Sequence, residues 1–177
     1  MDKKALRAKI REQKRAMTTE QIEQASARLG ELFVQTQQYQ QAKTIYGYLP
    51  YNQEVRTVPM LEQAMRDGKR VAVPKCYGDE MKFIYMDDLT KVENGYANIP
   101  EPIADEPVAD DKTALVLMPG MAFTKNGDRM GYGGGFYDKF LAAEPDHPTV
   151  ALCYDFQMVE SLPTEEYDIP VDCVLWA

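Results

Sequence analysis

The sequence predicts an α/β protein: a single domain with a three-layer α/β/α arrangement around a mainly parallel, Rossmann-like sheet. Residues 44–49 and 71–74 are short apolar runs bounded by turn residues, as expected of buried strands. A helical segment at residues 58–66 lies between them, which is the strand–helix–strand order of a parallel sheet covered on both faces. The chain of 177 residues can form one substantial core but not two comfortable ones, so residues 1–177 are expected to be one domain.

The N-terminal part of the chain is expected to form two amphipathic helices. Residues 2–17 carry seven Lys or Arg side chains, and their apolar residues recur on one helical face. Thr18 and Gln21 have the spacing of a capping box, in which each side chain satisfies a free amide of the other residue. A second helix is therefore expected to begin at this pair and to end near the glutamine-rich residues 35–41.

The rest of the chain continues the alternation of strands and helices. Residues 99–111 are acidic and punctuated by proline, so they are expected to cross the surface as a solvated connection. A helix is expected after Gly135, where apolar residues recur at three-to-four spacing, and a short helix is expected at residues 157–162. Apolar or alternating runs predict further strands or hairpin arms at residues 81–86, 114–118, 149–153 and 172–176.

Composition argues against several classes of function. A net charge of −8 disfavours binding of nucleic acid over a broad surface. His147 is the only histidine and stands beside Pro148 in an expected turn, which argues against Ser-His-Asp or Cys-His catalysis and against a histidine-rich metal site. No apolar run reaches membrane-spanning length, the N-terminus lacks a signal-peptide core, and the three cysteines are widely spaced. We therefore expect a cytoplasmic monomer whose partners are small molecules, with no nucleic acid and no membrane.

Residues 118–141 are the most informative stretch of the chain. An apolar strand leads into a glycine-rich loop, and the expected helix follows. Amides at a helix N-terminus attract anions, glycine lets the backbone come close to a ligand, and Arg129 adds a planar cation at the mouth of the loop. The stretch matches neither the Walker A nor the dinucleotide-binding pattern. By themselves the residues leave two interpretations, an anion cradle or a flexible loop beside a core helix. The glycines are Gly127, Gly131, Gly133, Gly134 and Gly135.

Four other side chains are expected near this loop. Lys3 and Arg7 are four residues apart, so they share one side of the first helix and could close over one polyanion. An ordinary solvated face is the alternative. Leu49 and Glu54 follow the end of the first expected strand, and ligands of parallel sheets bind beyond the C-terminal ends of the strands. Glu54 then either faces this crevice or is a solvated loop acid.

The stretch from Pro119 to Phe123, followed by residues 129–138, closely resembles the signature of the 5-formyltetrahydrofolate cyclo-ligases, also called methenyltetrahydrofolate synthetases. Weaker resemblance extends to residues 3–7, 49–57 and 99–102. The resemblance implies an ATP- and magnesium-dependent ligase of folate and one-carbon metabolism. In the implied reaction ATP phosphorylates the formyl oxygen of 5-formyltetrahydrofolate and N10 closes the ring, giving 5,10-methenyltetrahydrofolate, ADP and phosphate.

The resemblance also implies roles for individual residues. Arg129 would be catalytic, at the reacting phosphate, and Asp138 and Asp172 would bind Mg²⁺. The residues implied in ATP binding are Lys3, Lys4, Ala5, Leu6, Arg7, Arg129, Met130, Gly131, Tyr132, Gly133, Gly134, Gly135, Phe136 and Tyr137. The residues implied in folate binding are Leu49, Glu54, Tyr132, Gly133, Gly134, Gly135 and Phe136.

Two departures from the family pattern, and two other classes of function, complete these expectations. Many relatives have lysine where this chain has Gly134, which shifts the phosphate-binding task to Arg129 and magnesium, and some have an aromatic residue where it has Ala97. A module that binds folate or nucleotide without turnover remains an alternative. So does a phosphosugar isomerase or acyl-CoA-type transferase on a similar sheet, which would turn over its substrate without ATP. Taken alone, Asp138 could simply pair with the helix dipole and Asp172 could be a strand-edge acid.

Overall fold

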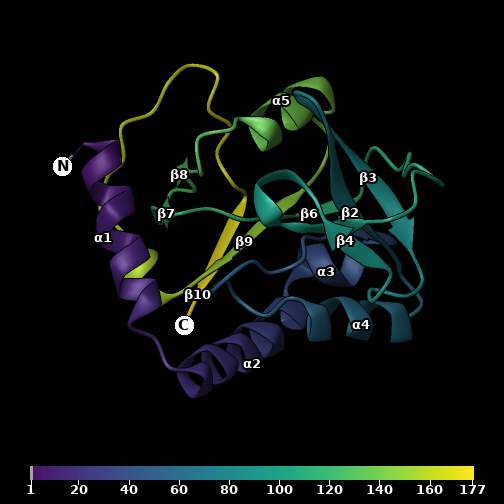
Figure 1. The fold of residues 1–177 in the computed structure, drawn as a ribbon, viewed down its shortest axis with the longest axis horizontal. Helices are drawn as coiled ribbons and strands as arrows, with labels where there is room; N and C mark the ends of the chain where they lie inside the picture. The colour runs from purple at the N-terminus through teal and green to yellow at the C-terminus, as the bar shows by residue number, and fades with distance from the viewer. Residues whose placement is uncertain (1) are drawn as a thin grey trace.

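One six-stranded sheet forms the centre of the computed structural model, which describes residues 2–177 (Figure 1). Its strand order is β10-β9-β6-β1-β2-β3. The first five strands in that order run parallel, and β3 joins the edge antiparallel to β2. The predicted mainly parallel sheet is thus confirmed. The strands are β1 (Thr44–Tyr46), β2 (Arg70–Tyr77), β3 (Glu80–Met86), β6 (Leu115–Met118), β9 (Thr149–Cys153) and β10 (Cys173–Trp176).

Helices cover both faces of the sheet, giving the predicted three layers (Figure 1). The helices α2 (Thr19–Gln35), α3 (Gln37–Gln41) and α4 (Val58–Arg66) lie on one face, and α5 (Phe136–Ala143) lies on the other. Alternate residues of β6 show the two-sided burial: Leu115 and Leu117 belong to the core under α2 and α4, whereas Val116 belongs to the core under α5. All four residues of β6 are buried, as expected of a central parallel strand.

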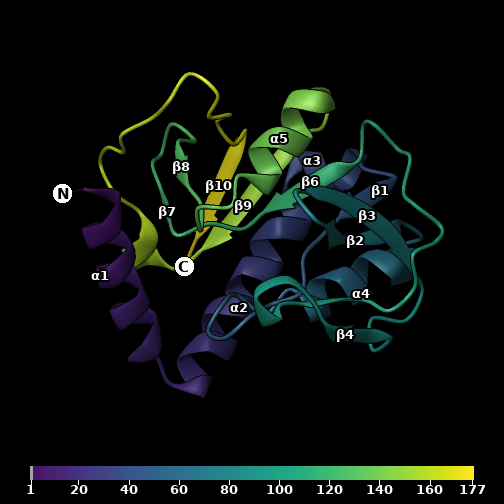
Figure 2. The same ribbon diagram turned by 45° about the horizontal axis from the view of Figure 1, so that its top comes forward.

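The helix α1 (Lys3–Arg15) belongs to neither layer and packs beside a small hairpin (Figure 2). The hairpin consists of β7 (Ala122–Phe123) and β8 (Arg129–Met130). Leu6 and Ile10 of α1 form a separate buried cluster with Met121, Ala122 and Met130. The amphipathic pattern of the first helix therefore serves to dock a basic helix against the segment that contains the glycine-rich loop.

Local signals located several elements well. The capping box at Thr18 and Gln21 is present, and the helix predicted at residues 58–66 has those bounds. The short helix predicted at residues 157–162 is wrong. The structure has a 3₁₀ turn, η2 (Asp155–Gln157), because the Gln157 side chain is drawn into the core, where it accepts from the amide of Tyr154 and donates to two buried carbonyls.

The proline-punctuated crossing at residues 99–111 contains structure that the sequence did not predict. A second hairpin pairs β4 (Val92–Asn94) with β5 (Pro100–Pro102), and the 3₁₀ turn η1 (Tyr96–Asn98) connects them. This hairpin brings its turn to the C-terminal side of β2, where it forms one wall of the site described below. Among the described residues no helix is both long enough and apolar enough to span a bilayer.

Candidate active site

A cavity of about 640 Å³ lies beyond the C-terminal ends of β1 and β6. It is lined from α1 by Lys3 and Arg7, from the segment after β1 by Leu49 and Glu54, and from the glycine-rich loop by residues 129–138. Segments that are far apart in the sequence therefore meet in one cavity, as the strand-end argument predicted.

Three residues predicted near ATP do not reach this cavity with their side chains. Lys4 and Ala5 are exposed, and Leu6 is buried against the β7–β8 hairpin. The reason is helical periodicity: residues 3 and 7 share one face of α1, whereas the three residues between them point elsewhere. Contact between these three residues and ATP remains a prediction from the family pattern alone.

The glycine-rich loop ends at the start of α5 with two glycines in the left-handed region. Gly133 has φ of 110° and Gly135 has φ of 71°, conformations that other residues adopt only with strain. Gly135 is the N-cap of α5 and has no side chain with which to cap the first amides of the helix. These amides are left for solvent or for a ligand at the positive end of the helix dipole. The backbone geometry is compatible with the anion cradle expected from the sequence, and binding of an anion there remains a prediction.

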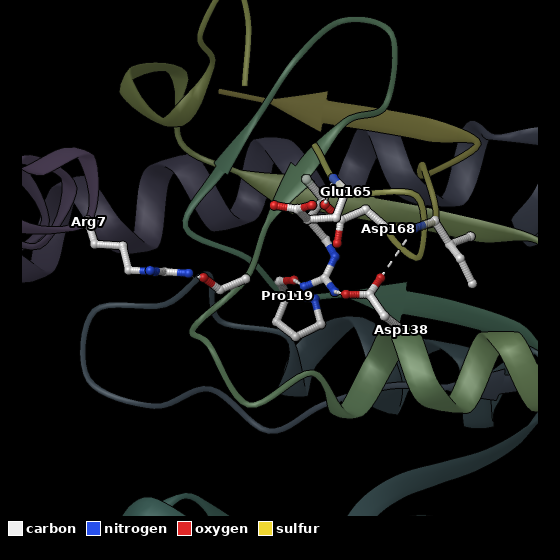
Figure 3. A network of polar contacts seen from close by, with 8 residues as sticks. Arg7, Pro119, Asp138, Glu165 and Asp168 are labelled. Carbon is white, nitrogen blue, oxygen red and sulfur yellow. Dashed lines mark hydrogen bonds and ion pairs between the residues drawn. The ribbon is translucent and has the colours of Figure 1, made fainter. Parts of the chain in front are cut away.

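Arg129 of β8 is held by contacts with Pro119 and Asp138, both of which are labelled in Figure 3. Its guanidinium donates to the carbonyl of Pro119 at 3.0 Å and to the Asp138 carboxylate at 3.3 Å. Only 6% of its side chain is exposed, and its Nε is buried without a hydrogen-bond partner among residues 2–177. A buried cation with an unused donor is suited to an anionic ligand. Arg7 approaches the same loop from α1 and donates from its Nε to the carbonyl of Gly131 at 3.1 Å.

Glu54 lies in the cavity with both carboxylate oxygens engaged. Its Oε1 accepts from the backbone amide of Tyr51 at 2.7 Å, and its Oε2 accepts from the hydroxyl of Tyr132 at 2.8 Å. Burial raises the pKa of Glu54, while the bond from Tyr132 and the charge of Lys14 act in the opposite direction. Each oxygen retains a lone pair, so this carboxylate could still accept two N–H bonds from a flat heterocycle.

Sequence reasoning missed other residues that line the cavity. Lys14 is buried near Tyr132, and its position seven residues after Arg7 on the same helical face was the available signal.

Tyr96 of η1 is exposed at the cavity and packs edge-on against Phe136, with ring centroids 5.1 Å apart. Glu101 accepts the amide of Cys76 at 3.2 Å, and both line the opposite wall. The β4–β5 hairpin that carries Tyr96 and Glu101 has no strong local sequence signal.

The two predicted magnesium ligands are not brought together. Asp138 lines the cavity, but Asp172 is exposed and precedes β10, whereas the cavity lies beyond the ends of β1 and β6. The Asp172 carboxylate accepts the amide of Thr149 at 2.9 Å, and the Thr149 hydroxyl accepts the Asp172 amide at 2.8 Å. Across residues 2–177 no group of three or more His, Cys, Asp or Glu side chains is arranged to hold a metal ion.

The single histidine is structural. His147 is buried, and its ring nitrogens lie 2.7 Å from the carbonyl oxygen of Ala114 and 2.9 Å from the carboxylate of Glu144. It does not line the cavity, which agrees with the expectation that histidine takes no part in the chemistry. Of the three free cysteines, Cys153 is buried and Cys76 and Cys173 are partly buried.

The chain is similar in sequence and in fold to proteins named 5-formyltetrahydrofolate cyclo-ligase or 5,10-methenyltetrahydrofolate synthetase. The model described as the 5-formyltetrahydrofolate cyclo-ligase family matches residues 1–177. The 5-formyltetrahydrofolate cyclo-ligase of Escherichia coli (strain K12) is 31% identical over 173 residues, covering 94% of this chain and 95% of that protein. The one of Mus musculus is 27% identical over 188 residues, covering 98% and 93%. The solution structure of Aquifex aeolicus 5,10-methenyltetrahydrofolate synthetase superposes with a TM-score of 0.85 at 26% identity, covering 99% of this chain and 90% of that one.

Proposed function

The chain belongs to the 5-formyltetrahydrofolate cyclo-ligase family, and from that premise we propose how its cavity converts 5-formyltetrahydrofolate to 5,10-methenyltetrahydrofolate with ATP. The formyl oxygen on N5 attacks the γ-phosphorus of ATP, and ADP leaves. N10 then attacks the formyl carbon and loses its proton, the C–O bond breaks, and phosphate departs. Neither step needs a protein nucleophile, so positioning and charge stabilisation are the enzyme's tasks.

Arg129 and the loop amides are the groups proposed to hold the transferred phosphoryl. A charge-assisted hydrogen bond contributes about 1.5–3 kcal/mol, whereas the helix dipole contributes only about 0.3–1 kcal/mol at an exposed site. The guanidinium should therefore dominate, with the amides before Phe136 as its partners. Lys3 and Arg7 line the same cavity from α1 and would contact the remainder of ATP.

Glu54 is proposed to bind the pterin ring of the folate. A carboxylate with a free lone pair on each oxygen can accept two parallel N–H bonds from the ring amide and amine. Leu49 and Phe136 also line the cavity and would provide apolar surface for the ring system. The single observation that carries the proposal is that Tyr132 belongs to the glycine-rich loop and also bonds Glu54, so the two proposed substrate sites share one wall.

Magnesium is implied by the family, but the predicted ligand pair does not fit a joint site. Asp138 is paired with Arg129, and Asp172 is bonded to Thr149 outside the cavity. We therefore assign no step to a metal ion held by these two acids. Mg²⁺ enters the proposal only as the ion carried by the ATP phosphates. A monomeric, cytoplasmic enzyme of one domain with an N-terminal basic helix is part of the same proposal.

Two variants test the assignment of the two substrate sites. Arg129→Ala should lose about 10²–10³-fold in kcat, the size seen when a donor to a developing anion is removed, with folate affinity nearly unchanged. Glu54→Gln should weaken folate binding by about tenfold or more while ATP binding persists, since it removes a charged acceptor. Turnover is read from the absorbance of methenyltetrahydrofolate and from ADP release, and affinities from direct titration.

Matched controls come from an exposed ion pair on α2. Arg28 and Glu31 lie 3.3 Å apart on the surface, so Arg28→Ala and Glu31→Gln should leave turnover and both affinities unchanged. Wild-type protein that binds folate and ATP but forms no ADP would be a binding module, and the proposed reaction would be wrong. Turnover of a sugar phosphate without ATP would favour the isomerase or transferase alternative.

A further inference from the structure

Lys14 is a buried lysine that the proposed reaction does not use. Only 7% of the residue is exposed, and its Nζ lies 3.4 Å from the hydroxyl of Tyr132 and 5.6 Å from the centroid of that ring. Burial lowers the pKa of Lys14, and the nearby Glu54 carboxylate acts against that shift. An ammonium group is costly to bury unless an opposite charge offsets the lost hydration. The position of Lys14 therefore requires a compensating partner.

The Tyr132 hydroxyl connects Lys14 to that partner. It donates to Glu54 at 2.8 Å, so the ammonium nitrogen and the carboxylate oxygen are at most about 6 Å apart. The three side chains come from α1, from the segment after β1 and from the glycine-rich loop. A line of hydrogen bonds thus connects three of the segments that line the cavity.

The geometry points to Lys14 as a positioning residue for the folate: it holds Tyr132 in place and sets a positive charge beside the Glu54 carboxylate that would bind the pterin ring. This inference rests on the proposed contact between Glu54 and folate. Lys14 itself is not assigned a contact with the reacting atoms. Its charge acts on the carboxylate, and its hydrogen bond acts on the loop residue that shares the carboxylate.

Among residues 2–177, no other cation near Glu54 also hydrogen-bonds the Tyr132 hydroxyl. Burial raises the pKa of the surrounding tyrosines, so none of them contributes a charge near neutral pH. Arg56 is the other cation acting on the carboxylate, but its guanidinium donates to the backbone carbonyls of Asn52 at 2.8 Å and Glu54 at 3.4 Å. The groups that face Glu54 or Lys14 are Arg11, Tyr48, Arg56, Tyr132, Tyr137, Cys153 and Tyr154.

The test is the pH dependence of the KM for 5-formyltetrahydrofolate at saturating Mg²⁺ and ATP. Removing a cation beside a carboxylate raises the pKa of that carboxylate, so Lys14→Met should lose folate affinity at a higher pH than the wild type. We expect the pH at which the variant loses affinity on acidification, its acid limb, to rise by about 2 units, as for unit charges about 6 Å apart at an effective dielectric of about 20. Lys14→Arg keeps the charge and should keep the wild-type limb. Lys9→Met, an exposed change on the same helix, is the control.

The outcomes distinguish an electrostatic role of Lys14 from a role in packing alone. An acid limb at the wild-type pH in Lys14→Met would overturn the inference, as would equal displacement of the limb in Lys14→Met and Lys14→Arg. Thermal unfolding of each variant checks its fold, and Lys14→Gln, neutral but able to reach the Tyr132 hydroxyl, replaces the methionine variant should that one not fold. An unchanged folate titration in Glu54→Gln would instead refute the proposed folate site, so the two failures can be told apart.

Discussion

Replacing Gly131 by alanine should misplace Arg129 without unfolding the protein. An ideal Cβ at Gly131 would lie 2.9 Å from the Nη1 atom of Arg129, and that atom also donates to the carbonyl of Pro119 at 3.0 Å. An ordinary contact needs about 3.5 Å, so the guanidinium must shift by about 0.5 Å or more. Gly131 is not among the glycines with positive φ, so its backbone accepts alanine.

The magnitude follows from how sensitive catalysis is to position. Because a displacement of about 1 Å can cost 10²-fold in rate, Gly131→Ala should lower kcat by about 10–100-fold, or about 1.4–2.7 kcal/mol of transition-state stabilisation. Folate affinity should change little, since Glu54 contacts neither Gly131 nor Arg129. Steady-state kinetics at saturating ATP and a folate titration measure the two quantities separately.

A double-mutant cycle identifies the cause. Lysine at position 129 lacks the Nη1 atom, so Gly131→Ala should have a much smaller additional effect in an Arg129→Lys background. Wild-type kcat in Gly131→Ala, or two losses that simply multiply, would refute the reasoning. Gly30→Ala is the matched control. Gly30 lies on α2, which does not line the cavity, and its added Cβ would lie 3.5 Å from the Met60 side chain. It should leave turnover unchanged and add about 0.5–1 kcal/mol of stability.

Four further predictions concern acids and thiols. Asp138→Ala should lower the free energy of unfolding by about 2 kcal/mol in urea titrations, because it leaves the buried Arg129 guanidinium without a counter-charge. Asp172→Asn should leave the Mg²⁺ concentration for half-maximal turnover within about twofold of wild type, whereas loss of a ligand would raise it about tenfold or more. Burial raises the pKa of Cys153 to about 12, so alkylation of the folded protein followed by mass spectrometry should leave this thiol unmodified at about pH 8 and reach it only as the pH approaches that value. Cys76 lines the cavity and should be protected by bound folate, whereas Cys173 should not.

Controls accompany each of these predictions. Asp146→Ala removes an exposed acid and should not change the unfolding free energy by more than about 0.5 kcal/mol. Equal stability of the Asp146 and Asp138 variants would argue against the counter-charge explanation. A large rise in the Mg²⁺ requirement of the Asp172 variant would restore that residue as a ligand. Alkylation of Cys76 at the same rate with and without folate would place the substrate elsewhere.

The elements predicted well are those whose signals are local. Val58–Arg66 has an N-terminal proline and a glycine just beyond its end, and both boundaries agree with the sequence. Residues 157–162 had helical composition, but tertiary hydrogen bonds of Gln157 to carbonyls of the β6–β7 connection hold that segment in another conformation. Three-residue strands such as β4 and β5 carry too few side chains for periodicity to be detected.

The residues of the candidate site also fall into two groups, those that could be predicted from the sequence and those that could not. Arg129 and Glu54 could be expected in one crevice because both follow the C-terminal ends of parallel strands. Asp172 lies before a strand rather than after one, and its predicted role as a metal ligand came from the family pattern alone. Lys14 was one of seven basic residues on the first helix, and only its spacing from Arg7 distinguished it in the sequence. Its burial depends on how Leu6 and Ile10 dock that helix against the β7–β8 hairpin.

The sequence by itself determined the order of the apolar runs, the glycines before α5 and the basic character of the first helix. Each of these features depends on residues that are near one another in the chain. Only the tertiary structure determined which charged side chains are buried away from water. Dehydration depends on packing between segments as distant as residues 14, 54 and 132, and it separates Lys14, Arg129 and Glu54 from the other charged residues of an acidic chain.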